Sequence, residues 1–235
     1  MKKTLLIAAA ALVAGIVTSE AQVYSANVVG YANVVLPGNG QYTLIANPFD
    51  DGNGNHLTNL ITSIPGGAAS VRSTLFYYPG APATINKLAG GWGADAILTP
   101  GVGFYIRNGA PGGNAPTVTN TFVGTVIPLA GASVTNQIPN GFSLQGSVVP
   151  LAGNIAIGGT PGGDANLDYG DSIVSIGAGA GISKLQTWNT ALQSPATVNK
   201  VFSTGNWGST VAVTVGQGFW IINQGPNTNM VQTLP

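Results

Sequence analysis

An internal repeat constrains the fold of this chain more than any other feature of its sequence. The segment Pro82–Leu88, Pro-Ala-Thr-Ile-Asn-Lys-Leu, returns as Pro-Ala-Thr-Val-Asn-Lys-Val at residues 195–201. Matching segments in the same order indicate a tandem duplication of a unit of about 100 residues, an ordinary size for a domain. The other matched segments are Trp92-Gly93 with Trp207-Gly208, and Gly101–Ile106 with Gly216–Ile221.

The first 21 residues have the three parts of a secretory signal peptide. Lys2 and Lys3 form a basic start, residues 5–17 form an apolar run, and Ser19-Glu20-Ala21 provides a cleavage site with small residues at its first and third positions. The alternative, a membrane anchor, fits less well because the apolar run is short for a bilayer span. We therefore expect export, a mature chain that starts at Gln22, and no membrane insertion after cleavage.

The expected mature chain is almost uncharged. Without Lys2, Lys3 and Glu20, five basic and six acidic residues remain, a formal net charge of −1, and none of the acids is glutamate. Nucleic-acid binding needs clustered Lys and Arg that displace counterions from phosphates, so we expect no nucleic-acid partner. The chain also has no cysteine, which excludes a disulfide framework, a thiol nucleophile and a Cys-ligated zinc site.

Short segments rich in Val, Ile, Thr and aromatic residues, separated by Gly, Pro and Asn, predict an all-β fold. We expect two tandem, related β-sandwich or partly closed barrel domains, at residues 22–122 and 123–235, with little helix apart from the signal peptide. A short helical turn is expected at residues 56–64, with a counterpart at 171–176. The expected strands are residues 28–36, 42–46, 73–78, 84–88, 103–107 and 117–126, then 123–129, 142–148, 184–188, 197–202, 218–222 and 230–234.

Two stretches resemble a broad group of exported bacterial β-rich repeat proteins. They are Tyr42–Pro48, an aromatic-Thr-Leu-Ile-x-Asn-Pro motif, and Leu98–Phe104, which contains Pro-Gly-x-Gly-Phe; the opening of the mature chain, Val23–Tyr31, is similar as well. The second copy departs from the pattern, because Ser147-Val148 stands where the first copy has Asn47-Pro48. The resemblance implies a β-rich fold and export, and it supplies no catalytic residues.

Acidic residues gather in two loops that occupy similar places in the two copies. Both fit Asp-x-Asn-x-Asn/Asp, a spacing with which oxygen ligands can surround Ca²⁺. The same residue types also build ordinary turns, so both interpretations stay open. Neither loop has the bidentate Glu of an EF-hand. The candidate ligands are Asp51, Asn53 and Asn55 in the first loop, and Asp164, Asn166, Asp168 and Asp171 in the second.

His56 is the sole histidine, so a Ser-His-Asp triad would have to include it. Ser63, Ser70 and Ser73 are nearby hydroxyls, but no Gly-x-Ser-x-Gly motif is present, and a solvated loop histidine is the expected role. The chain has few titratable side chains that could carry out acid–base catalysis, so we expect that the protein is not an enzyme.

Aromatic residues are the other candidate functional group. Trp92, Trp188, Trp207 and Trp220, with Tyr77, Tyr78 and Tyr105, could stack on sugar rings or pack in the core, and matching positions in the copies favour packing. These features favour a non-catalytic structural or adhesive protein of the cell surface or matrix, either secreted or held at the surface, with the periplasm as another destination. The expected partners are further copies of the chain or surface glycans, and the alternative function is a pair of carbohydrate-binding modules, with Ca²⁺ as an optional stabiliser.

Overall fold

The computed structural model describes residues 28–67, 74–77, 83–127, 132–150, 152–156, 167–169, 172–176, 182–199 and 211–233. Within these ranges the chain forms antiparallel β-sheets and one four-residue helix, α2 (Leu57–Leu60), which confirms the predicted all-β class. Among these residues no helix has the length and apolar character needed to cross a bilayer.

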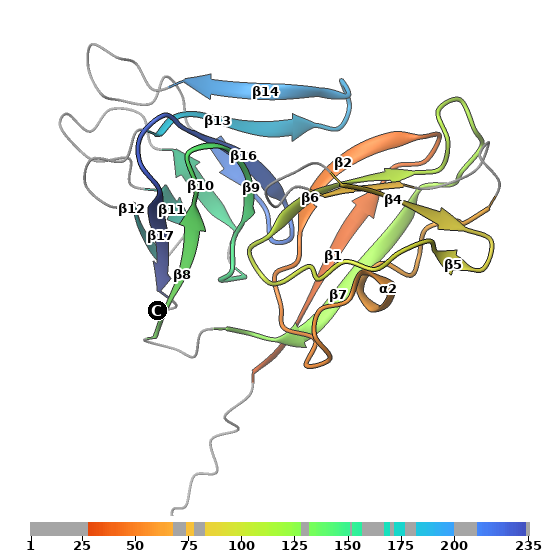
Figure 1. Cartoon of the computed structure of the whole chain (residues 1–235), viewed down its shortest axis with the longest axis horizontal. Coiled ribbons are helices and arrows are strands. Elements are labelled where there is room, and N and C mark those ends of the chain that lie inside the picture. Colours follow the sequence, from red (N-terminus) through yellow and green to blue (C-terminus); the bar gives the residue numbers. More distant parts are fainter. Residues whose placement is uncertain are drawn as a thin grey trace, which may run out of the picture.

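The first half of the chain forms two layers (Figure 1). One layer is a five-stranded sheet with the strand order β2-β6-β3-β4-β5, and the other is a ribbon of β1 and β7. Side chains alternate between the two faces of a strand, so the ribbon presents one face to the core and one to solvent. The strands are β1 (Val29–Leu36), β2 (Gln41–Ala46), β3 (Thr74–Tyr77), β4 (Ala83–Leu88), β5 (Gly91–Trp92), β6 (Gly103–Asn108) and β7 (Val118–Thr125).

The second half repeats this plan with additions. One sheet has the order β14-β13-β16-β9, a second has β11-β12-β17-β8, and β10 pairs with β15. Strands β9, β16, β13 and β14 follow the order of β2, β6, β3 and β4, and β8–β17 corresponds to β1–β7. The strands are β8 (Ser133–Ile138), β9 (Gly141–Gly146), β10 (Gly153–Ala156), β11 (Leu167–Tyr169), β12 (Ser172–Ile176), β13 (Ile182–Asn189), β14 (Ser194–Asn199), β15 (Val211–Val213), β16 (Gly218–Asn223) and β17 (Thr228–Thr233).

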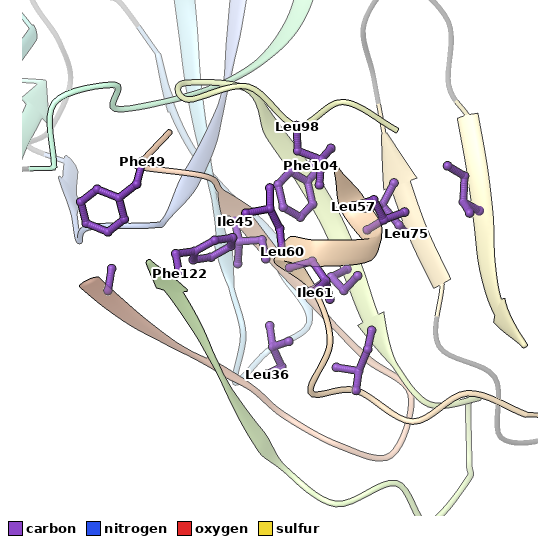
Figure 2. Close-up of a cluster of buried hydrophobic side chains, with 14 of the residues drawn as sticks. Leu36, Ile45, Phe49, Leu57, Leu60, Ile61, Leu75, Leu98, Phe104 and Phe122 are labelled. Atoms are coloured by element: carbon purple, nitrogen blue, oxygen red, sulfur yellow. The ribbon is translucent and has the colours of Figure 1, made fainter. Parts of the chain in front are cut away.

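The core of the first half lies between the five-stranded sheet and the β1–β7 ribbon (Figure 2). Ile45, Phe104 and Leu75 come from the sheet, and Phe122 comes from the ribbon. Helix α2 and the residues after it enter this space with apolar side chains. The buried members of this segment are Leu57, Leu60, Ile61 and Ile64. Burying these side chains is the dominant favourable contribution to folding, because apolar surface is removed from water.

Two expectations about local structure are settled by these elements. The helical turn expected at residues 56–64 is confirmed as α2. The counterpart expected at 171–176 is wrong, because Ser172–Ile176 is strand β12, which pairs with β11 and β17. Three β-branched residues among the five of Ser-Ile-Val-Ser-Ile favour a strand over a helix.

The connection between the halves also differs from the expected pattern. Residues 123–125, expected to open a strand of the second copy, complete β7, and all eight residues of β7 pair with β1. The second half begins its pairing at β8, a strand that the sequence did not predict. The expected boundary between residues 122 and 123 therefore falls inside β7, and the pairing pattern divides the halves after Thr125.

Candidate functional site

The two halves meet where β2 and β9 end and where β6 and β16 begin (Figure 1). The N–H of Ala46 donates to the carbonyl of Gly216 at 2.8 Å, and the N–H of Gly146 donates to the carbonyl of Gly101 at 2.9 Å. Ala46 and Gly146 hold the same position in β2 and β9, and Gly101 and Gly216 hold the same position in the sequence repeat. Equivalent surfaces of the two halves therefore contact each other, as the two subunits do in an isologous two-fold dimer.

Glycine permits the close approach at this contact. A Cβ on Gly103 would lie 2.7 Å from a carbonyl oxygen of β9, and a Cβ on Gly218 would lie 2.7 Å from a carbonyl oxygen of β2. Gly101 and Gly216 have φ angles of 84° and 81°, in the left-handed region that favours glycine. The repeated Gly-x-Gly motif therefore serves the contact between the halves, with the first glycine needed for its φ angle and the second for its missing side chain.

A row of five aromatic side chains crosses the same contact. The neighbouring ring centroids lie 5.2–6.3 Å apart, a range typical of edge-to-face and tilted aromatic pairs. The indole N–H of Trp220 donates to the hydroxyl of Tyr105 at 3.0 Å, so two residues at equivalent positions bond to each other. Burial raises the pKa of Tyr105, and the hydrogen bond from Trp220 opposes this shift. In order, the row is Tyr42, Trp188, Tyr105, Trp220 and Phe142.

Only Phe142 of this row is exposed, at 54%, and the other four side chains are half-buried. Trp92 lies elsewhere, where it packs against the core of the first half and donates its indole N–H to the Ile61 carbonyl at 3.0 Å. The ammonium of Lys87 lies 5.6 Å from the Trp92 ring centroid, and burial lowers the pKa of this lysine. The described tryptophans thus make structural contacts, while Trp207, Tyr78 and the side chain of Tyr77 lie outside the described residues.

A glutamine protects the free edge of β2. The side-chain oxygen of Gln193 accepts the N–H of Tyr42 at 2.7 Å, and its side-chain nitrogen donates to the Tyr42 carbonyl at 3.2 Å. The indole N–H of Trp188 donates to the same carbonyl at 2.8 Å. The β13–β14 turn of the second half therefore supplies the pairing that a neighbouring strand would give, which blunts an edge open to association.

Each half has a groove between its first two strands, closed at one end by a turn of the other half. The groove beside β9, which we call the β9 groove, has a volume of about 460 Å³. Its counterpart beside β2, the β2 groove, has a volume of about 260 Å³. The turns that close them, Thr99–Val102 and Thr214–Gln217, are equivalent segments of the repeat, so the two grooves are related by the same pseudo-two-fold arrangement.

A buried hydroxyl lines each groove at the same position. Ser143 belongs to the β9 groove and Thr43 to the β2 groove, and they are 5% and 8% exposed. Neither hydroxyl oxygen has a hydrogen-bond partner among the described residues. A buried polar group without a partner costs about 1–3 kcal/mol, and both halves carry such a hydroxyl at the equivalent position beside their grooves.

The first acidic loop uses its oxygens to build a turn. The Asp51 carboxylate accepts the N–H groups of Asn53 and Asn55, each at 2.8 Å, and the Asn55 side-chain oxygen accepts the Asp51 N–H at 3.0 Å. Such bonds between Asx side chains and nearby backbone are typical of tight turns. No cluster of three or more His, Asp or Glu occurs among the described residues. Calcium binding by Asp51, Asn53 and Asn55 stays a prediction, and the turn explains their spacing without an ion.

The second acidic loop lies almost wholly outside the described residues. Asp164, Asn166 and Asp171 fall there, and Asp168 is described only as a backbone position in β11, paired with Ile173. The structure therefore does not bring these four candidate ligands together in a described site, and calcium binding by them also stays a prediction.

His56 pairs with a carboxylate on the protein surface. Its Nδ1 lies 2.5 Å from an oxygen of Asp95, and the two side chains are 40% and 39% exposed. Partial burial acts to raise the pKa of Asp95, but hydrogen bonds from His56, Ala96 and Thr58 outweigh it and hold the pKa below its usual value. Ser63 donates its hydroxyl to Asn120 at 3.0 Å, while Ser70 and Ser73 lie outside the described residues. Within the described part of the chain no hydroxyl bonds to His56, so no triad is assembled there.

Sequence reasoning missed the grooves and the glutamine that covers the β2 edge. Pairing β8 with β1 as equivalent strands would have revealed the groove residues, but the low similarity of these segments hid that equivalence. No protein-family model matches the sequence, and neither the search of curated proteins nor the search of solved structures found a match.

Proposed function

We propose that this is an exported, non-catalytic structural or adhesive protein of the cell surface or matrix, and that copies associate through the solvent face of the β1–β7 ribbon. One observation carries the proposal. Four apolar side chains on this face are exposed by more than half, and they follow the two paired strands. They are Val29 (69%), Tyr31 (75%), Val35 (58%) and Val123 (54%).

The second copy shows that the fold does not require this apolar face. At the positions equivalent to Tyr31, Val35 and Val123, the β8–β17 pair carries Ser133, Gln137 and Thr233. Small and polar residues therefore serve the same strands in the second half. Retention of exposed Val and Tyr in the first half supports a role in contact, because solvent-exposed apolar patches mark interaction surfaces.

The size of the face favours weak, repeated association with a second copy. The four side chains expose on the order of 400 Å², below the roughly 800 Å² per partner that a stable complex buries. Their strip carries no charge, so it presents no electrostatic barrier to an identical surface. Many weak contacts on a crowded surface combine into strong attachment.

The test is sedimentation of the mature chain over a wide concentration range, compared with the variant Tyr31→Ser/Val35→Gln/Val123→Thr. These replacements copy the second half, so the fold should tolerate them. We expect the unaltered protein to show concentration-dependent association and the variant to remain monomeric. Ser133→Tyr/Gln137→Val is the matched gain-of-contact variant, and it should strengthen association.

Two results would contradict the proposal. One is a mature protein that stays monomeric at every concentration. The other is association that survives in the triple variant, with circular dichroism showing an unchanged fold. Turnover in a broad hydrolase screen that disappears in His56→Ala would contradict the non-catalytic part separately.

A further inference from the structure

The β9 groove differs chemically from its pseudo-symmetric counterpart. Asn136 and Gln137 line it where Val34 and Val35 line the β2 groove. The two grooves therefore share a backbone framework and differ in side chains. The β9 groove is larger, at about 460 Å³, which lies within the 300–1,000 Å³ typical of small-molecule sites.

No charged residue lines either groove. A ligand with a phosphate or carboxylate would find no cationic partner there, and a cation would find no carboxylate. The amide of Asn136 carries donors and an acceptor and lies beside Gly101 in the turn that closes the groove, whereas Gln137, the next residue of β8, directs its side chain to the opposite face of the strand. Ser143 lies at the groove wall, but its hydroxyl is buried and is not among the groups that a ligand would contact.

Phe142 supplies the apolar part of the site. Its ring is 54% exposed at the end of the aromatic row, next to Trp220 at a centroid distance of 6.0 Å. An exposed ring beside uncharged donors and acceptors suits a ligand that has both an apolar face and many hydroxyl groups. Sugar rings have this combination, because their C–H faces lie against aromatic rings while their hydroxyls donate and accept.

We propose that the β9 groove binds a neutral saccharide, with Phe142 under the sugar ring and the amide of Asn136 bonded to its hydroxyls. This site lies apart from the outer face of the β1–β7 ribbon. Saccharide binding and self-association are therefore independent, and either can fail without the other.

The test is titration of the mature protein with cellohexaose, maltohexaose and the hexamer of N-acetylglucosamine, followed by calorimetry and by tryptophan fluorescence. Trp220 touches Phe142, so binding should change its emission. We expect saturable binding of at least one neutral hexasaccharide and none of a hexamer of galacturonic acid. Asn136→Val gives the groove the valine that its counterpart has at the same position, and it should weaken binding by about tenfold or more.

A second variant guards against damage to the contact between the halves, because Asn136 lies near Gly101. Phe142→Ala changes an exposed ring, so it should fold normally and should also weaken binding by about tenfold. Tyr31→Ser, on the separate outer face, is the matched control and should bind like the unaltered protein. The proposal is overturned if none of the neutral hexasaccharides binds, if the charged hexamer binds equally, or if both groove variants retain full affinity.

Discussion

The inner faces of β7 and β17 occupy the same place in the two halves, yet they are filled with different chemistry. In the first half Asn120 is buried, accepts the hydroxyl of Ser63 at 3.0 Å and donates to the Leu60 carbonyl at 3.0 Å. In the second half the equivalent position holds Met230, which is fully buried. The asparagine serves the end of α2, whose last carbonyls have no partner within the helix. A buried methionine instead fills space with apolar atoms.

The turn after β2 and the turn after β9 differ in the same way. Asn47 donates to Asn55 at 3.1 Å and to the Leu98 carbonyl at 2.9 Å, which holds the acidic loop of the first half. In the second half Ser147 accepts from the Gln232 side chain at 2.7 Å, and Gln232 also accepts the Val148 N–H at 2.8 Å. The shared framework thus accepts different polar networks at this turn, and in each of them the buried side chain finds a hydrogen-bond partner. The contact between the halves, in contrast, uses the same glycines in both copies.

The largest expected effect comes from breaking that shared contact. Gly218→Val places a side chain against the carbonyl of Ile45, and Gly103→Val does the same against the carbonyl of Gln145. Each change should lower the free energy of unfolding by about 3 kcal/mol, because backbone cannot move aside as a flexible side chain can. Urea unfolding followed by tryptophan fluorescence measures the loss.

Gly90→Ala is the control for these variants, since a Cβ there has no heavy atom within 4 Å. It should change the stability little. Valine variants that unfold at the same urea concentration as the unaltered protein would show that the halves do not meet as described.

An intermediate effect on stability is expected from replacing the equivalent inner residues Asn120 of β7 and Met230 of β17. Asn120→Met leaves the Leu60 carbonyl and the Ser63 hydroxyl without their partner, so it should cost about 2 kcal/mol. Met230→Leu, an apolar exchange of similar volume, should cost less than about 1.5 kcal/mol. Thermal unfolding of both variants provides the comparison, and equal losses would argue against a special role for Asn120.

The smallest effect on stability is expected at the surface pair of His56 and Asp95, which lies in the first half. Asp95→Asn should cost less than about 1 kcal/mol at neutral pH, because exposed ion pairs contribute little. The pKa of Asp95 is lower in the folded protein than in the unfolded chain. Its contribution to stability is therefore present above the unfolded pKa and is lost as the pH falls through the folded pKa.

Acid unfolding midpoints measure this difference. As the pH falls through the folded-state pKa of Asp95, the unaltered protein should lose slightly more stability than Asp95→Asn. The difference between their free energies of unfolding should therefore disappear. A gap that stays constant down to strongly acidic pH would mean that the carboxylate does not titrate as the structure indicates.

Local patterns were sufficient for the all-β class and for strands such as β2, β6 and β16. Their short runs of apolar and aromatic residues, with glycines nearby, are visible in the sequence. The pairing partners of each strand could not be read from the sequence. Strand β7 and the start of β1 share a Val-Gly pair, and this similarity suggested a second copy that begins too early. The grooves depend on which turn meets which strand from the other half. That is a long-range property, and no local pattern encodes it.

The reciprocal glycine contact has a consequence for how the protein behaves at low concentration. In a homodimer with such a surface, the two partners separate when the solution is diluted. Here a single polypeptide carries both sides, so the contact between the copies has the same strength in a dilute solution as in a concentrated one.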